Sequence, residues 1–165
     1  MVRRARGDGR GSHTVTRPGR FTRRALLWWA LWLLWCGMIF FVSADPVFTG
    51  ESTGEAIQQV APAPLAERPQ LVDALNVLIR KSGHFLGFAI LGALSWAALA
   101  HFPRPRRLGL WAWAVATLYA ASDEWHQSLV PGRTGAFRDV VLDSVGAAVA
   151  ILCVTLVFRR ANRIE

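Results

Sequence analysis

Nine ionisable or amide side chains occur in three short segments of this chain, and their types suit ligand binding. They are Lys81, His84, Asp123, Glu124, His126, Gln127, Arg133, Asp139 and Asp143. Ammonium and guanidinium groups bind phosphate or carboxylate, and a guanidinium can do so bidentately. Aspartate, histidine and glutamine side chains add further hydrogen bonds. We therefore predict that all nine belong to one binding site.

The same residues include candidates for catalysis. A histidine oriented by a carboxylate can act as a general base, which makes His84, Asp123 and His126 the candidates. Histidine and carboxylate side chains can also hold a divalent metal that activates water. No HExxH or comparable spacing is present, so no residue is assigned as a metal ligand and no cofactor is predicted. Ser122 and Ser128 are candidate nucleophiles only by nearness, because no nucleophile motif surrounds them.

Long apolar runs separate the polar segments and must position them. No charge occurs from Ala25 to Ala44, and a helix of that length, at about 1.5 Å per residue, matches a hydrocarbon core of about 30 Å. The predicted spans are residues 25–44, 82–102, 108–122 and 140–158. The third is short unless its helix continues through Asp123 to Gln127. The predicted fold is all-α, a polytopic membrane bundle of four transmembrane helices.

The distribution of positive charge predicts the orientation of this bundle. The net charge is +8 although 53% of the residues are hydrophobic. Most of the arginines lie in the N-terminal tail, in the loop at 103–107 and at the C-terminal end. With four spans these segments share one side, which the positive-inside rule places in the cytoplasm. The prediction is a multi-pass plasma-membrane protein with both termini cytoplasmic, and its charge pattern does not indicate nucleic-acid binding.

A second interpretation of the first apolar run, residues 25–44, is a cleaved signal peptide. Val42-Ser43-Ala44 resembles a small-residue cleavage site. The run is longer than the usual ~7–15 apolar residues of such a segment, which favours a retained anchor.

Under the predicted topology the three polar segments meet at the outer membrane boundary. On a helix, Tyr119, Asp123 and His126 lie within a narrow arc, with Gln127 at its edge. Asp143 lies one turn into its span and is expected to face the bundle interior, where it needs a partner. We therefore infer that the second, third and fourth spans turn their polar faces inward, around a site open to the outside.

Small residues on the same helix faces are expected to bring these helices close together. Gly146 and Ala150 share the face of Asp143, and Gly83 and Gly87 form a second small pair beside His84. Small side chains let two transmembrane helices approach closely. Both pairs are therefore predicted at helix contacts.

Each polar residue also has a purely structural interpretation. Lys81 could anchor its helix at the interface, and Asp143 could pair with Arg138 or Lys81 to fix helix register. Glu124 lies roughly 100° from Asp123 around the helix and could point toward water or the loop. The gathering of so many such residues at one depth favours the functional interpretation.

Four motifs, in this order, resemble the VanZ-like family, which is named for a glycopeptide-resistance protein. They are Lys81-x-x-His84-Phe85 with Leu91-Gly92, Ser122-Asp123-Glu124-x-His126-Gln127, Pro131-Gly132-Arg133, and Asp139-x-x-x-Asp143-x-x-Gly146. The resemblance covers about residues 75–158 and implies a membrane protein with several spans and a teicoplanin-resistance-type role. Two positions depart from the family pattern. Gly87 stands where members often carry an acidic residue, and Asp143 stands where they often carry Asn.

The predicted organisation has five parts. They are a disordered basic cytoplasmic tail at 1–24, an anchor helix at 25–44, an extracytoplasmic connector at 45–74, a VanZ-like membrane domain with three spans at 75–158, and a cytoplasmic tail at 159–165. Within residues 71–79 the apolar spacing indicates a helix at the membrane interface.

Three functions are compatible with this sequence. The preferred one is an envelope protein whose outer polar site binds a lipid-linked or glycopeptide-related ligand. The second is a membrane-embedded hydrolase, metal-dependent or not, that acts on a lipid-linked or envelope substrate. The third is a structural subunit of a membrane complex. The lipid bilayer is the one partner that the composition itself predicts.

Overall fold

Every regular element in the described part of this protein is a helix, which confirms the all-α prediction. The computed structural model describes residues 22–45, 50–102, 107–131, 133 and 135–161. The helices are α1 (Arg23–Ala44), α2 (Gly50–Val60), α3 (Ala63–Ala66), α4 (Pro69–Leu99), α5 (Leu108–Gln127) and α6 (Phe137–Ala161). Most of the predicted tail at 1–24, most of the loop at 103–107 and the end of the tail at 159–165 lie outside the described residues, as does Gly132 of the Pro131-Gly132-Arg133 motif.

Three of the described helices, α1, α4 and α6, are long and apolar enough to cross a membrane. The α5 helix has 20 residues, which at about 1.5 Å each also suffices for a hydrocarbon core of about 30 Å. Its last turn, however, carries Asp123, Glu124 and His126. The predicted continuation of this helix through Gln127 is confirmed, while its status as a fourth span stays a prediction.

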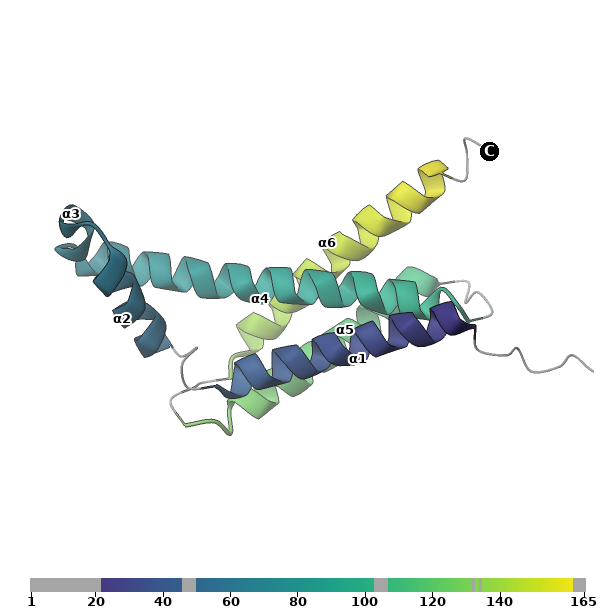
Figure 1. The fold of residues 1–165 in the computed structure, drawn as a ribbon, viewed down its shortest axis with the longest axis horizontal. Coiled ribbons are helices and arrows are strands. Elements are labelled where there is room, and N and C mark those ends of the chain that lie inside the picture. The colour runs from purple at the N-terminus through teal and green to yellow at the C-terminus, as the bar shows by residue number, and fades with distance from the viewer. Residues whose placement is uncertain (1–21, 46–49, 103–106, 132, 134, 162–165) are drawn as a thin grey trace, which may run out of the picture.

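The connector between the first two spans contains more structure than its polar composition indicated. It holds α2 and α3, which lie beside the start of α4 (Figure 1). The helix expected at 71–79 and the span expected at 82–102 are one continuous helix of 31 residues, with Pro69 in its first turn. Proline is well accommodated there because the first backbone N–H groups of a helix have no intrahelical partner.

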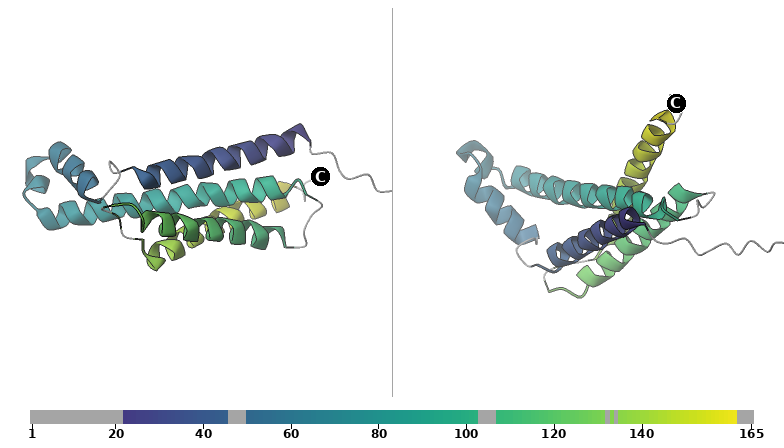
Figure 2. Two further views of the ribbon diagram at one scale, coloured as in Figure 1. Left: turned by 90° about the horizontal axis from the view of Figure 1, so that it is seen from below. Right: turned by 45° about the vertical axis from the view of Figure 1, so that its right-hand side comes forward.

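The α4 helix is the centre of the bundle and packs against each of the other five described helices. Figures 1 and 2 show α6 crossing α4, with α1 and α5 running alongside one another. The core between these helices joins Phe88 and Leu91 of α4 to the fully buried alanines Ala116, Ala120 and Ala147. Such small side chains let helices approach closely in a membrane bundle.

Two glycines mark the closest contacts between α4 and α6. A Cβ atom on Gly92 would lie 2.7 Å from the carbonyl oxygen of Ala147, and one on Gly146 would lie 2.5 Å from the carbonyl oxygen of Phe85. The contact predicted at Gly146 is therefore present. No comparable close approach occurs at Gly83 and Gly87, because a Cβ at either position would meet nothing within 4 Å among the described residues. Gly87 still contacts α1, since its carbonyl oxygen accepts a hydrogen bond of 2.9 Å from Trp35 Nε1.

The arginine-bearing ends of the helices lie together at one end of the bundle. Figures 1 and 2 show the start of α1, the end of α4, the start of α5 and the C-terminal end of α6 at that end. The end of α1, the end of α5 and the start of α6 lie at the opposite end. This is the arrangement that the positive-inside rule requires, and the assignment of the arginine end to the cytoplasm stays a prediction.

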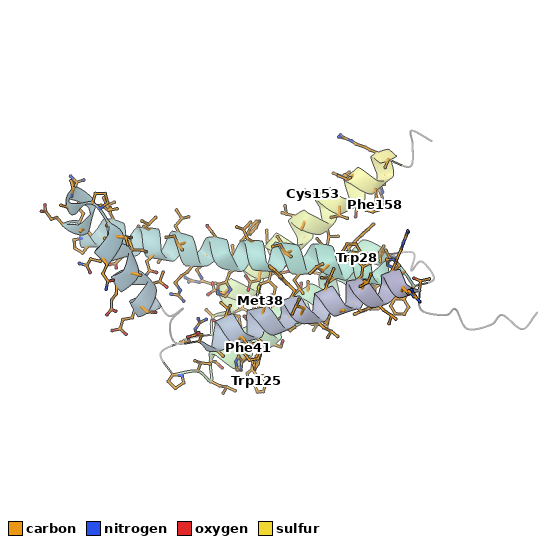
Figure 3. The ribbon with its side chains drawn as sticks, in the orientation of Figure 1. Trp28, Met38, Phe41, Trp125, Cys153 and Phe158 are labelled. Atoms are coloured by element: carbon orange, nitrogen blue, oxygen red, sulfur yellow. The ribbon has the colours of Figure 1, made fainter. Side chains whose placement is uncertain are left out.

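Aromatic side chains project outward near both ends of the bundle. Figure 3 shows Phe41 and Trp125 at the end opposite the arginines, and Trp28 and Phe158 toward the arginine end. Phe41 is 73% exposed and Trp125 69% exposed. Large aromatic side chains are enriched at the two interfaces of a membrane. This exposure is therefore expected of a surface that faces lipid.

Candidate functional site

The polar residues near the end opposite the arginines form two buried groups, one on each side of α5. The first is centred on Asp123, which is 3% exposed and lies between α5 and α1. Its Oδ2 accepts hydrogen bonds from Ser43 Oγ at 3.0 Å and from Gln127 Nε2 at 2.8 Å. A buried carboxylate needs such donors because it has lost its contact with water.

Arg133 connects this first group to the loop between α5 and α6. Its two terminal guanidinium nitrogens donate to Gln127 Oε1 at 3.3 Å and to the carbonyl oxygen of Val42 at 3.2 Å. Burial lowers the pKa of the Arg133 side chain below its usual value, and the charge of nearby Arg80 acts in the same direction. The loop arginine is thus held against the end of α1, with a second arginine close to it.

The second group lies between α4, α5 and α6 and consists of His84, Glu124 and Asp143. Asp143 is fully buried and Glu124 is 5% exposed. His84 Nδ1 lies 3.3 Å from Asp143 Oδ2, and Glu124 Oε2 accepts a hydrogen bond of 2.8 Å from the backbone N–H of Ala136. One ligand atom from each of the three side chains lies within 4.8 Å of the other two.

Lys81 and Asp139 form an ion pair close to the second group. Lys81 is 43% exposed, so this pair is worth less than a buried one. The structural pairing of Asp143 with Arg138 or Lys81 that the sequence allowed is wrong, because His84 contacts Asp143 and Lys81 contacts Asp139.

The predicted arc on α5 exists, but it faces α1. The Tyr119 hydroxyl donates to the carbonyl oxygen of Cys36 at 2.5 Å. The ring of His126 stacks on Phe40 with 4.3 Å between ring centroids and 21° between ring planes. Because Asp123 also faces α1, the side of α5 with these three residues packs on the anchor helix.

Glu124 projects to the opposite side of α5. The expected contact with the loop is present, since Glu124 Oε2 accepts a hydrogen bond from the backbone N–H of Ala136 between α5 and α6. The side chain does not point toward water, because it is buried beside His84 and Asp143. Ser122 and Ser128 are exposed, and each hydroxyl donates to a backbone carbonyl three residues earlier. The two serines therefore join neither buried group.

A cavity of about 540 Å³ opens beside both groups, where α1, α2 and α4 meet. Its apolar walls come from Met38, Ile39, Val42, Ala56, Ile79 and Phe88. Its polar lining comes from Ser43, Ser52, Thr53, Arg80, His84, Asp123 and Arg133. Met38, labelled in Figure 3, marks the side of the cavity that α1 forms. The cavity thus combines an apolar wall with two arginines.

The two glycines that were expected at a close helix contact, Gly83 and Gly87, lie at this cavity instead. Gly83 and Gly87 both line it, which explains why a Cβ atom there would meet no neighbour. Their small size therefore adds to the volume of the cavity.

Arg80 and Ser43 are site residues that the sequence interpretation missed. Arg80 could have been predicted from the sequence, because positions 80, 83, 84 and 87 lie on one face of a helix. Ser43 had none, since its partner Asp123 is 80 residues away in the sequence and nothing in the local pattern brings α1 to α5.

A comparison with protein-family models finds a match over residues 28–158, and the matching model is described as VanZ/LLP1. Comparisons with curated proteins and with solved structures find no match. The matched range begins within α1 and includes both buried groups and all the residues given above as lining the cavity. It covers well over half of the chain and confirms the resemblance drawn from the four motifs. This helical, membrane-type chain therefore belongs to the VanZ/LLP1 family.

Proposed function

We propose that this protein binds an amphiphile with an anionic headgroup at the outer boundary of the plasma membrane. The observation that carries the proposal is the cavity between α1, α2 and α4, in which two arginines lie beside an apolar wall. A lipid-linked intermediate of the cell envelope has this combination of a phosphate headgroup and a hydrocarbon chain. Binding such a ligand, or the glycopeptide that targets it, would give the protein an antibiotic-resistance-type role.

The charge of the cavity supports an anionic ligand. Arg80 comes from α4 and Arg133 from the loop after α5, and both line the same space. Asp123 lines it as well, so the cavity has two arginines and one aspartate and positive charge is in excess. Guanidinium groups match phosphate oxygens well because they donate parallel hydrogen bonds.

The N-terminal end of α2 adds to this positive environment. The guanidinium of Arg80 lies against Gly50, the first residue of α2, where a Cβ atom would be 2.7 Å from one of its nitrogens. The start of a helix carries a partial positive charge from its unpaired N–H groups. In this proposal the headgroup lies near Arg80 and the hydrocarbon chain lies along Ile39 and Phe88, which line the cavity.

The test is a binding measurement with a variant that fills the cavity. A Gly87→Leu substitution adds a side chain where a Cβ meets no neighbour, so the helix should fold while the cavity becomes smaller. We expect polyprenyl phosphate to bind the wild-type protein saturably in nanodiscs, and the variant to bind it about tenfold more weakly or worse. Native mass spectrometry of the nanodisc complexes measures both.

Gly37→Leu is the matched control for this experiment. Gly37 also lacks neighbours within 4 Å among the described residues, but it does not line the cavity. It should therefore bind the probe like the wild type. Teicoplanin serves as a second probe, to separate a lipid ligand from the antibiotic. Equal binding by the Gly87 and Gly37 variants, or no saturable binding of either probe, would rule out the proposal.

Hydrolysis of the bound amphiphile is a second candidate function, and the position of His84 favours it. His84 lines the cavity, and its Nδ1 lies 3.3 Å from a carboxylate oxygen of Asp143. A carboxylate in this position orients a histidine that acts as a general base. Of the three catalytic candidates, only His84 has this arrangement, since His126 is stacked on Phe40. Recovery of cleaved rather than intact probe from the nanodiscs would distinguish the enzyme from the binding protein.

A further inference from the structure

We propose that His84, Glu124 and Asp143 bind one divalent transition metal ion, of the Zn²⁺ or Mn²⁺ type. The three side chains come from α4, α5 and α6, so the ion would join the three helices near the end opposite the arginines. This metal site is independent of the proposed amphiphile, because the three side chains would bind the ion whether or not the cavity is occupied.

The geometry of the three side chains suits a metal. One imidazole nitrogen and two carboxylate oxygens lie within 4.8 Å of one another. Two ligands bound to zinc at about 2.1 Å in tetrahedral geometry lie about 3.4 Å apart. His84 Nδ1 and Asp143 Oδ2 are 3.3 Å apart. At that separation both atoms could contact one ion without a large movement of either helix.

Two buried oxygens in the group have no hydrogen-bond donor among the described residues. They are Asp143 Oδ1 and Glu124 Oε1. Asp143 is fully buried and Glu124 is 5% exposed, so bulk solvent does not reach these oxygens. Removing a carboxylate from water without a compensating charge is costly. A bound cation would supply what these two carboxylates lack.

The nearby cations already contact other groups. Lys81 pairs with Asp139, one turn before Asp143. Arg133 donates to Gln127 and to the carbonyl oxygen of Val42, on the other side of α5. Among the described residues, the two carboxylates and the histidine of the second group therefore form no ion pair with a lysine or arginine.

The ligand types narrow the choice of metal. Imidazole with carboxylate favours Zn²⁺, Mn²⁺ and similar ions over Mg²⁺ and Ca²⁺, which prefer oxygen ligands alone. Three protein ligands leave at least one coordination position open, as in catalytic rather than structural zinc sites. An ion here would also fix the ring of His84, which lines the cavity.

The experiment measures metal binding by the full-length protein in detergent. The protein carries a purification tag without histidine, is stripped with a chelator and is then titrated with Zn²⁺ or Mn²⁺ alone. We expect about one equivalent of bound ion per chain by elemental analysis. We also expect a higher melting temperature in the presence of the ion, because a ligand that binds only the folded state stabilises it.

Substitutions within the group and beside it provide matched comparisons. His84→Gln and Asp143→Asn should each lower metal affinity by about tenfold or more. His126→Gln and Asp73→Asn change a histidine and an exposed aspartate outside the group, and should leave the affinity unchanged. Circular dichroism and size-exclusion chromatography confirm that each variant is folded.

Three results would overturn the metal site. The first is that the folded, metal-free wild-type protein binds neither Zn²⁺ nor Mn²⁺ at micromolar concentration. This result is expected if the two carboxylates share a proton instead of binding an ion. The second is unchanged affinity in folded His84→Gln and Asp143→Asn variants. The third is equal or stronger binding of Mg²⁺ or Ca²⁺. No amphiphile is present in these titrations. A negative result would therefore contradict the metal site alone, and the proposed function is tested by the separate binding experiment.

Discussion

Replacing both cavity arginines, in an Arg80→Ala/Arg133→Ala double variant, is expected to weaken binding of polyprenyl phosphate by about 100-fold or more. A hydrogen bond to a charged group contributes about 1.5–3 kcal/mol, and about 1.4 kcal/mol corresponds to a tenfold change in affinity. Two such contacts to one phosphate therefore account for the whole effect. Titration of nanodiscs with the probe, followed by native mass spectrometry, measures the affinity.

The two single variants are expected to differ in their side effects. Arg133 also donates to Gln127 and to the backbone of Val42, so its removal loosens the contact between the loop and α1. Arg80→Ala is the cleaner substitution and should weaken binding by about tenfold or more on its own. Arg138→Ala is the control. It removes an exposed arginine near the same end of the bundle that does not line the cavity. If the double variant bound as tightly as the Arg138 variant, the arginines would have no part in ligand binding.

Replacing Gly146 by a larger residue is expected to destabilise the contact between α4 and α6. A Cβ atom at this position would lie 2.5 Å from the carbonyl oxygen of Phe85, and a backbone carbonyl cannot move without moving its helix. Gly146→Ala should lower the stability of the folded protein by about 1–3 kcal/mol. Gly146→Leu should prevent recovery of folded protein. Thermal unfolding in detergent, followed by circular dichroism, measures the change.

Gly83→Ala is the matched control for the Gly146 variants. Both glycines lie within long helices, so alanine improves helix propensity by about 1 kcal/mol at either position. A Cβ at Gly83 meets nothing within 4 Å among the described residues, and this variant should be as stable as the wild type or more so. Equal stability of the Gly83→Ala and Gly146→Ala proteins would mean that the close approach of α4 and α6 is absent.

The helices and the inward position of Asp143 were predictable because both follow from local physical requirements. A long apolar run forms a helix in a membrane because its backbone groups have no other partners there. A carboxylate one turn into such a run is costly unless it faces other helices. In the structure Asp143 is accordingly fully buried and contacts His84. The family was predictable for a different reason, since four short motifs in a fixed order are far more specific than composition.

The contacts of α5 were predictable only in part, because helical spacing shows which residues share a face but not what lies opposite it. Helical spacing correctly predicted that the side chains of Asp123 and Glu124 point about 100° apart around α5. Glu124 was nevertheless expected near water, because nothing in the sequence shows that α5 is covered on two sides. In the structure α1 covers the side of Asp123, while α4 and α6 cover the side of Glu124.

The role of Gly83 and Gly87 was mistaken for a related reason. A small-residue pair has the same spacing whether it admits a neighbouring helix or borders an empty space. Gly146 admits α4, whereas Gly83 and Gly87 border the cavity. The helices α2 and α3 were not expected at all, since their polar sequences lack the long apolar run that indicated the spans. One side of the cavity is therefore built by a segment that had been interpreted as a simple connector.

The central requirement of the proposed function is that the cavity and both buried groups lie on the outer side of the membrane, opposite the helix ends that carry Arg23, Arg107 and Arg159. Single cysteines introduced as Leu129→Cys and Arg159→Cys, in a background with Cys36→Ala and Cys153→Ala, test it directly. Both positions are exposed at opposite ends of the bundle. In intact cells a membrane-impermeant maleimide should label position 129, and it should reach position 159 only after the membrane is opened. Labelling of position 159 with protection of position 129 would place the cavity in the cytoplasm and contradict the proposed function.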